Sequence, residues 1–224
     1  MGKFLRFIGI LFMGLTSAFT ILGGVGTTCV ALDATQYEGM EAIAQFQWLY
    51  IFYVLATTAI GILGIRATIA LVKGKEKSYK DALIVLISGA VIGVIHIMTS
   101  RALRGSSMPV DMVVYATVIT LIIFLLFGLP KVKQLVGFEK GGDNGKTATG
   151  GMTSIVMGML FLSVQMWAGP THIFDGVNLA DYFHTQMMIS GGALFLTGLG
   201  LLVYAIMKSS TENEVVLQDS GISA

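Results

Sequence analysis

The sequence predicts an all-α membrane protein, a bundle of six transmembrane helices with the N- and C-termini both cytoplasmic. Three observations support this class: the composition, six long apolar segments, and an uneven distribution of lysine and arginine. Of the 224 residues, 54% are hydrophobic and only 12% are charged, whereas soluble domains carry about 25% charged residues. So little charge leaves too few polar side chains to cover the surface of a soluble globule of this size.

Each apolar segment is long enough to cross a bilayer. A helix rises ~1.5 Å per residue, so a hydrocarbon core of ~30 Å needs ~20 apolar residues. Backbone groups find no partners in lipid, and the segments are therefore expected to be helices. The expected spans are 6–31, 46–71, 82–103, 109–129, 151–169 and 180–207. They form one six-helix transmembrane domain over residues 1–208, and the polar segment 209–224 is expected to be a disordered cytoplasmic tail.

Lysine and arginine predict the orientation. With the N-terminus inside, all of the 14 basic residues except Arg101 and Arg104 fall on the cytoplasmic side. Cytoplasmic loops of membrane proteins carry such an excess of positive charge. Six spans then return the C-terminus to the cytoplasm. The expected location is the cell membrane, the inner membrane of a bacterial envelope, in multi-pass topology.

Local signals mark several helix ends. Tyr50 belongs to a group of aromatic residues expected at the outer membrane interface, where such rings are enriched. Ser78 and Asp81 have the spacing of a capping box before the third span. Asn178 is placed to cap the start of the sixth span.

The cytoplasmic loop 131–150 ends in a glycine-rich run and is expected to be a flexible linker. It divides the chain into four helices followed by two. Gly145-Lys146-Thr147 resembles the end of a phosphate-binding loop, but that motif needs glycine where Lys140 stands, and no strand precedes it.

Composition argues against several function classes. The net charge of +1 offers no excess of cations for a nucleic-acid partner. A single cysteine, Cys29, cannot form an intramolecular disulfide or a cysteine zinc site. The G-x-S-x-G sequence of a serine hydrolase is also absent from the sequence. These features favour a non-enzymatic protein.

One hypothesis for the polar residues is a b-type haem held by His96 and His184, in an electron-transfer subunit. Axial histidine is ordinary haem ligation, and Arg101 and Arg104 would meet the propionates. Glycines that would let a macrocycle approach share helix faces with these histidines: Gly89, Gly93, Gly191 and Gly192. The alternative is that Gly89-x-x-x-Gly93 is a helix-packing motif and that His184 faces interfacial water.

Two further hypotheses use the same part of the chain. His172 and His184, with Asp175 or Asp181, would form an external site for zinc or a similar ion. His96 with Arg101 would form a polar site for a substrate or a proton, because ionisable groups inside a membrane are expensive and often functional. The competing explanation for His96 is a structural hydrogen bond.

The leading expectation is a small transport component, or an accessory subunit of a membrane complex, with a polar site on the outer side. Its partners would be the lipid bilayer and possible membrane subunits or further copies of the chain, with no nucleic acid. The alternative is the haem-binding electron-transfer subunit.

Overall fold

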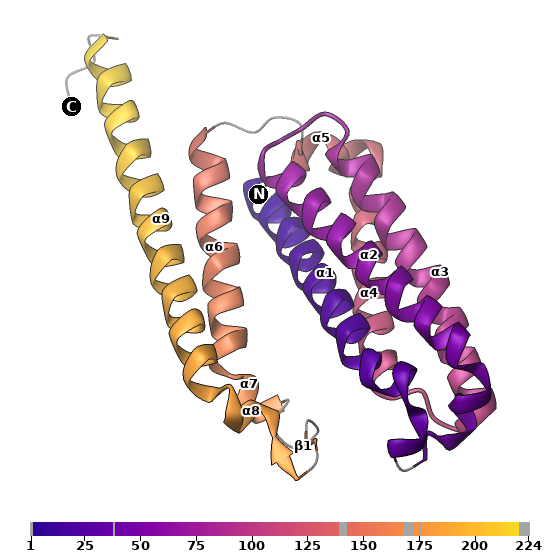
Figure 1. The fold of residues 1–224 in the computed structure, drawn as a ribbon. Helices are drawn as coiled ribbons and strands as arrows, with labels where there is room; N and C mark the ends of the chain where they lie inside the picture. The colour runs from indigo at the N-terminus through magenta and orange to yellow at the C-terminus, as the bar shows by residue number, and fades with distance from the viewer. Residues whose placement is uncertain (1, 38, 139–142, 168–172, 175, 220–224) are drawn as a thin grey trace. The chain divides into compact units, whose positions relative to one another are not determined.

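The protein consists of two compact units, Met1–Lys140 and Gly141–Ala224, as seen in a computed structural model (Figure 1). The structure describes residues 2–37, 39–138, 143–167, 173–174 and 176–219. Nearly all of these residues are helical, which confirms the all-α class. The two strands in the described part of the chain are two residues long and pair with each other.

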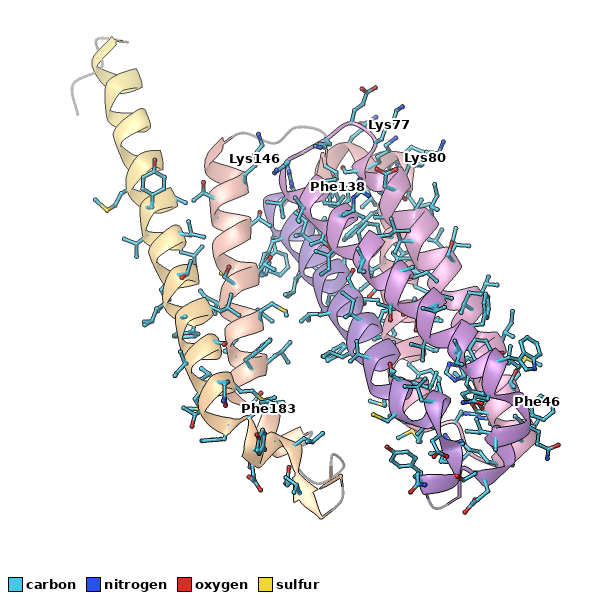
Figure 2. All side chains as sticks on the ribbon, in the orientation of Figure 1. Phe46, Lys77, Lys80, Phe138, Lys146 and Phe183 are labelled. Carbon is cyan, nitrogen blue, oxygen red and sulfur yellow. The ribbon has the colours of Figure 1, made fainter. Side chains whose placement is uncertain are left out.

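The first unit, here called the four-helix unit, is a ring of long helices. Its elements are α1 (Gly2–Leu32), η1 (Ala34–Gln36), η2 (Glu41–Phe46), α2 (Gln47–Val72), α3 (Ser78–Arg104), α4 (Val110–Phe127) and α5 (Pro130–Val136). Each long helix packs against the next, and α4 closes the ring against α1. Lys77 and Lys80 lie at one end of this unit and Phe46 at the other, as Figure 2 shows. The end with the lysines is the predicted cytoplasmic end.

The second unit, here called the helix-pair unit, is built on two antiparallel helices. Its elements are α6 (Asp143–Leu162), α7 (Val164–Trp167), β1 (Ile173–Phe174), β2 (Val177–Asn178), α8 (Leu179–Tyr182) and α9 (His184–Asp219). α6 and α9 pack along each other, and the short elements join their ends (Figure 1).

Five helices are long and apolar enough to cross a membrane, which supports a multi-pass membrane protein. They are Phe4–Leu32, Glu41–Val72, Ser78–Arg104, Val110–Phe127 and His184–Ala205. The expected fifth span, 151–169, is not among them. Its helix α6 begins in the polar glycine-rich sequence and ends at Leu162, so its apolar part is short.

Helix also extends into two segments that were expected to lack it. α5 and the first turns of α6 occupy parts of the expected loop 131–150. α9 continues to Asp219, inside the segment 209–224 where the sequence predicts a disordered tail.

The predicted caps have different outcomes. Asn178 is confirmed as a cap, since its side chain accepts hydrogen bonds from the amides of Ala180 at 2.9 Å and Asp181 at 3.4 Å. The helix that it caps is the short α8 rather than α9. The predicted capping box of Ser78 is wrong, because Lys77 occupies the N-cap position and Ser78 is already the first residue of α3. Ser78 Oγ is buried and has no hydrogen-bond partner among the described residues.

Arg6 lies inside the four-helix unit rather than on its cytoplasmic surface. Its Nη2 donates to the carbonyls of Leu71 at 3.0 Å and Val72 at 3.3 Å, and its Nη1 donates to that of Gly137 at 3.4 Å. The last carbonyls of a helix lack intrahelical partners and carry partial negative charge. Arg6 therefore stabilises the C-terminal ends of α2 and α5 and ties both to α1.

Glycines hold α6 and α9 at backbone contact. A Cβ at Gly158 would lie 2.7 Å from the carbonyl oxygen of Gly191, and one at Gly198 would lie 2.5 Å from that of Gly151. The two pairs are seven residues apart on each helix, so they recur on one face. Small residues at such positions let membrane helices approach closely and gain van der Waals contact. Gly191 thus serves packing against α6.

We expect Gly198→Ala to destabilise the helix-pair unit, because its methyl group would collide with backbone atoms of α6. Overpacking of this kind costs about 1–3 kcal/mol. Gly200→Ala is the matched control, since nothing lies within 4 Å of a Cβ at that position and alanine favours helix over glycine by ~1 kcal/mol. Thermal unfolding in mild detergent measures both. Equal melting temperatures for the two variants would show that the glycine contact does not hold the helices together.

Candidate functional site

The candidate site lies in the four-helix unit, between two apolar clusters. One cluster, toward the end that carries Lys77 and Lys80, contains Ile10, Met13, Leu71 and Phe124 among its members. The other, at the opposite end, includes Ala31, Ile43, Tyr50 and Tyr53. Buried polar side chains occupy the layer between them: Thr16, Ser17, Thr20, His96, Thr117 and Thr120. Each of the four long helices contributes at least one lining residue to the cavities within this layer.

His96 lies at the edge of this layer, against Tyr50 and Tyr53 of the second cluster. It is only 3% exposed, and its Nε2 has no hydrogen-bond partner in the described part of the chain. An unsatisfied buried polar group costs about 1–3 kcal/mol, and such groups in native proteins call for an explanation. The structural hydrogen bond considered from sequence does not account for this nitrogen.

Two tyrosines of α2 hold the imidazole ring in place. The ring of Tyr53 stacks on it, with centres 4.2 Å apart and planes 16° apart. Tyr50 meets it edge-on at 5.4 Å. Aromatic contacts of these geometries contribute about 0.5–1.5 kcal/mol beyond the burial of area. The ring of His96 is therefore covered on the side of α2.

Hydrogen bonds to α3 orient the same tyrosines. The hydroxyl of Tyr50 lies 2.8 Å from Ser100 Oγ, and that of Tyr53 lies 2.9 Å from Thr99 Oγ1. Both phenol groups are therefore hydrogen-bonded to residues of α3 that follow His96 in the chain. Tyr50 is buried, at 2% exposure, so its assignment to the lipid interface was wrong.

A cavity of about 30 Å³, here called the central chamber, borders His96. One water needs ~10–15 Å³ on this measure, so the volume accepts about two waters. Besides His96, Tyr53 and aliphatic side chains, four threonines and four glycines line it: Thr20, Thr27, Thr57, Thr117, Gly23, Gly24, Gly89 and Gly93. A smaller cavity of about 10 Å³ follows toward Met13 and shares Thr20, Ile60, Gly89 and Thr117 with the chamber.

The glycines beside His96 make room for neighbouring helices. A Cβ at Gly93 would lie 2.5 Å from Val114 Cγ2, and one at Gly89 would lie 3.4 Å from Thr117 Cγ2. α4 therefore fills the space in front of Gly93 that the haem hypothesis reserved for a macrocycle. His184 belongs to the helix-pair unit, where it is exposed, so the pairing of the two histidines stays a prediction.

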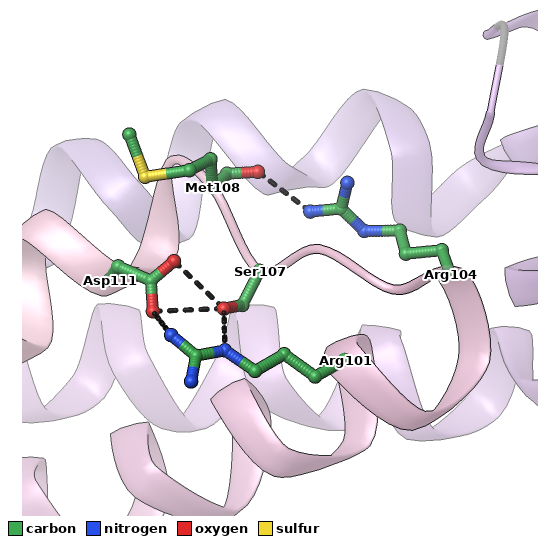
Figure 3. Close-up of polar contacts among 5 residues, drawn as sticks. All are labelled: Arg101, Arg104, Ser107, Met108 and Asp111. Atoms are coloured by element: carbon green, nitrogen blue, oxygen red, sulfur yellow. Dashed lines mark hydrogen bonds and ion pairs between the residues drawn. The ribbon is translucent and has the colours of Figure 1, made fainter.

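A second polar cluster joins the C-terminal end of α3 to the start of α4 (Figure 3). Arg101 Nη2 lies 2.9 Å from Asp111 Oδ1, and its Nε donates to Ser107 Oγ at 2.9 Å. Ser107 Oγ lies 2.8 Å from both carboxylate oxygens of Asp111. Arg104 Nη2 donates to the carbonyl of Met108 at 2.6 Å. Both arginines therefore bind the loop and start of α4, which is a structural use of residues predicted to meet a ligand.

The predicted metal site falls mostly on residues that the structure does not describe. His172 and Asp175 lie outside the described residues, so the site stays a prediction. Asp181 is described, and it accepts a hydrogen bond from Gln165. Within the described part of the chain, no group of three metal-ligating side chains comes together.

Asp33 lies between α1 and η1 in the four-helix unit. Thr35 donates to its carboxylate from the hydroxyl at 2.6 Å and from the amide at 3.2 Å. The side-chain hydrogen bond from Thr35 lowers the pKa of Asp33 below its usual value, because it favours the charged form. This carboxylate serves the turn and is separate from the chamber.

Sequence reasoning identified His96 but missed the tyrosines and threonines around it. The spacing of Tyr50 and Tyr53 could have predicted that they act together, because residues three apart lie on the same face of a helix. The threonines offered no such signal, because a hydroxyl can bond to its own helix and face any direction.

We expect Arg101→Gln to destabilise the four-helix unit more than Asp111→Asn does. The Arg101 side chain is 54% exposed and that of Asp111 only 7%. Loss of the arginine leaves a buried carboxylate without a counter-charge, which is costly, whereas a lone arginine can turn to water. Thermal unfolding of each single variant and of the double variant measures the difference. The reverse order, or strict additivity in the double variant, would contradict this role for the ion pair.

Comparison of the chain with models of protein families, with curated proteins and with solved structures finds no match.

Proposed function

We propose that the protein is a small transport component of the cell membrane, with six spans, cytoplasmic termini and its working site at His96 and the central chamber. The observation that carries this proposal is the buried Nε2 of His96, which has no hydrogen-bond partner among the described residues, in a side chain that borders a cavity with four threonines in its mainly apolar lining. An ionisable group held inside a membrane is costly and marks a pathway or binding site by default. The accessory-subunit interpretation makes no use of this feature.

The position of the chamber suits a transport site. Apolar clusters lie toward both ends of the four-helix unit, and the chamber borders the second of them at Tyr53. Transport sites near the middle of the membrane, reached from one side at a time, have this arrangement. The chemistry is binding and release, and it requires no enzymatic step.

The packing of α6 on α9 supports a sixth span. Gly191 and Gly198 lie inside the candidate span His184–Ala205, and they contact Gly158 and Gly151. If α9 crosses the bilayer, these contacts place 151–158 of α6 at the same depth. The excess of lysine at the α2–α3 turn and on α5 supports a cytoplasmic location for that end.

Six spans predict that Val177, between α6 and α9, faces the outside. We expect Val177→Cys to react with a membrane-impermeant thiol reagent in intact cells, in a background where the exposed Cys29 is replaced by serine. Glu76→Cys in the α2–α3 turn is the control, expected to react only after the cells are opened. Labelling of Val177→Cys only in opened cells would leave α6 outside the bilayer and contradict the six-span topology.

A transport site must also meet water at some stage of its cycle. We expect Thr117→Cys, which lines the chamber, to react with a small water-soluble thiol reagent in membranes. Ile119→Cys is the matched control on the same helix, because Ile119 is 51% exposed on the lipid-facing surface. The reagent reacts with the thiolate, which forms only where the cysteine meets water. The control cysteine would face lipid and should stay unmodified. A Thr117→Cys variant as inert as the control would argue against transport.

A further inference from the structure

The hydrogen-bonding pattern of the central chamber limits what it can bind. The hydroxyl of Thr20 donates to the carbonyl of Thr16 at 2.7 Å, and that of Thr117 donates to Val113 at 2.8 Å. Thr57 likewise donates to Tyr53 at 2.7 Å. Each hydroxyl has used its one donor and keeps acceptor capacity. These groups of the chamber therefore accept hydrogen bonds rather than donate them.

Size and charge restrict the occupant further. About 30 Å³ holds about two waters and no organic solute. Lysine and arginine are absent from the lining, so an anion finds no counter-charge. A small species that donates hydrogen bonds fits best, and water is that species. It would donate to the threonine oxygens and satisfy Nε2 of His96.

Among the residues that line the chamber, His96 carries the side chain that can take up a proton near neutral pH. From α2, Tyr50 and Tyr53 face it, but their hydroxyls are engaged by Ser100 and Thr99. The residues that line the chamber from α1 and α4 are threonine, glycine and valine. On α3 itself, the positive charge of Arg104 acts on His96 and opposes a positive charge on its ring, so proton uptake must work against this repulsion.

We propose that the central chamber holds water and that His96 takes up a proton from it at Nε2, so that the transported species is the proton. This proposal rests on the transport function above and names its cargo. A hydrated proton in the chamber transfers its proton to the lone pair of Nε2, which leaves a water molecule and an imidazolium ion. Release to water on the other side restores the neutral ring, and no other bond changes.

The test is proton flux into liposomes that contain the purified full-length protein and a pH-sensitive dye. A potassium gradient with valinomycin supplies the driving potential. We expect the wild-type protein to acidify the lumen faster than protein-free liposomes do. His96→Gln keeps a polar atom in the chamber but cannot bind a proton, and it should reduce flux to the protein-free rate. His184→Gln is the matched control, expected to retain wild-type flux.

Three results would overturn the proposal: no flux above protein-free liposomes, undiminished flux in His96→Gln, or flux that follows sodium instead of protons. Labelling of Thr117→Cys without proton flux would leave transport standing and reject the proton as cargo. If His96→Gln does not elute as folded protein, Thr117→Val decides, because it removes one acceptor and keeps the side-chain shape. Slower flux in this variant supports the proposal, and unchanged flux rejects it.

Discussion

Hydrogen bonds from hydroxyl side chains to the carbonyls of their own helices allow a polar layer inside this four-helix unit. Ser17 donates to Met13 at 2.6 Å, and Thr20 and Thr117 make the same bond four residues back. The lipid interior offers no water to satisfy such groups, so a free donor there would cost several kcal/mol. With their donors satisfied, hydroxyls can line a cavity at little cost, and the chamber can exist at the level of His96.

Close backbone contact is the second condition for the chamber. Gly61 and Gly64 of α2 face α1, where a Cβ at Gly61 would lie 2.9 Å from the amide of Ile21. Gly93 brings α3 against Val114 of α4. In lipid, helices associate through such contacts rather than through the hydrophobic effect. The ring of helices is thus tight at the glycines, and the space that remains borders His96.

The sequence predicted the class and most of the spans, because length and apolar composition suffice for a membrane helix. It could not predict which face of each helix points inward. In a soluble helix a polar face marks the surface, but here lipid-facing residues such as Leu55 and buried ones such as Leu71 are equally apolar. Tyr50 and Trp48 illustrate the difficulty. Tyr50 was expected at the membrane interface, yet it is 2% exposed, whereas Trp48, two residues earlier, is 68% exposed.

The two ends of the four-helix unit show that buried charge is not by itself the mark of a site. Arg6, at 9% exposure, is as buried as Ile97 of the core. Its Nη atoms donate to three carbonyls at helix ends, while its Nε has no partner among the described residues. Asp111, at 5% exposure, is balanced by Arg101 and Ser107. Each has partners from its own fold that explain its presence. His96 has aromatic neighbours for its ring, but the described part of the chain offers no hydrogen-bond partner for its Nε2. A ligand in the chamber would supply that partner.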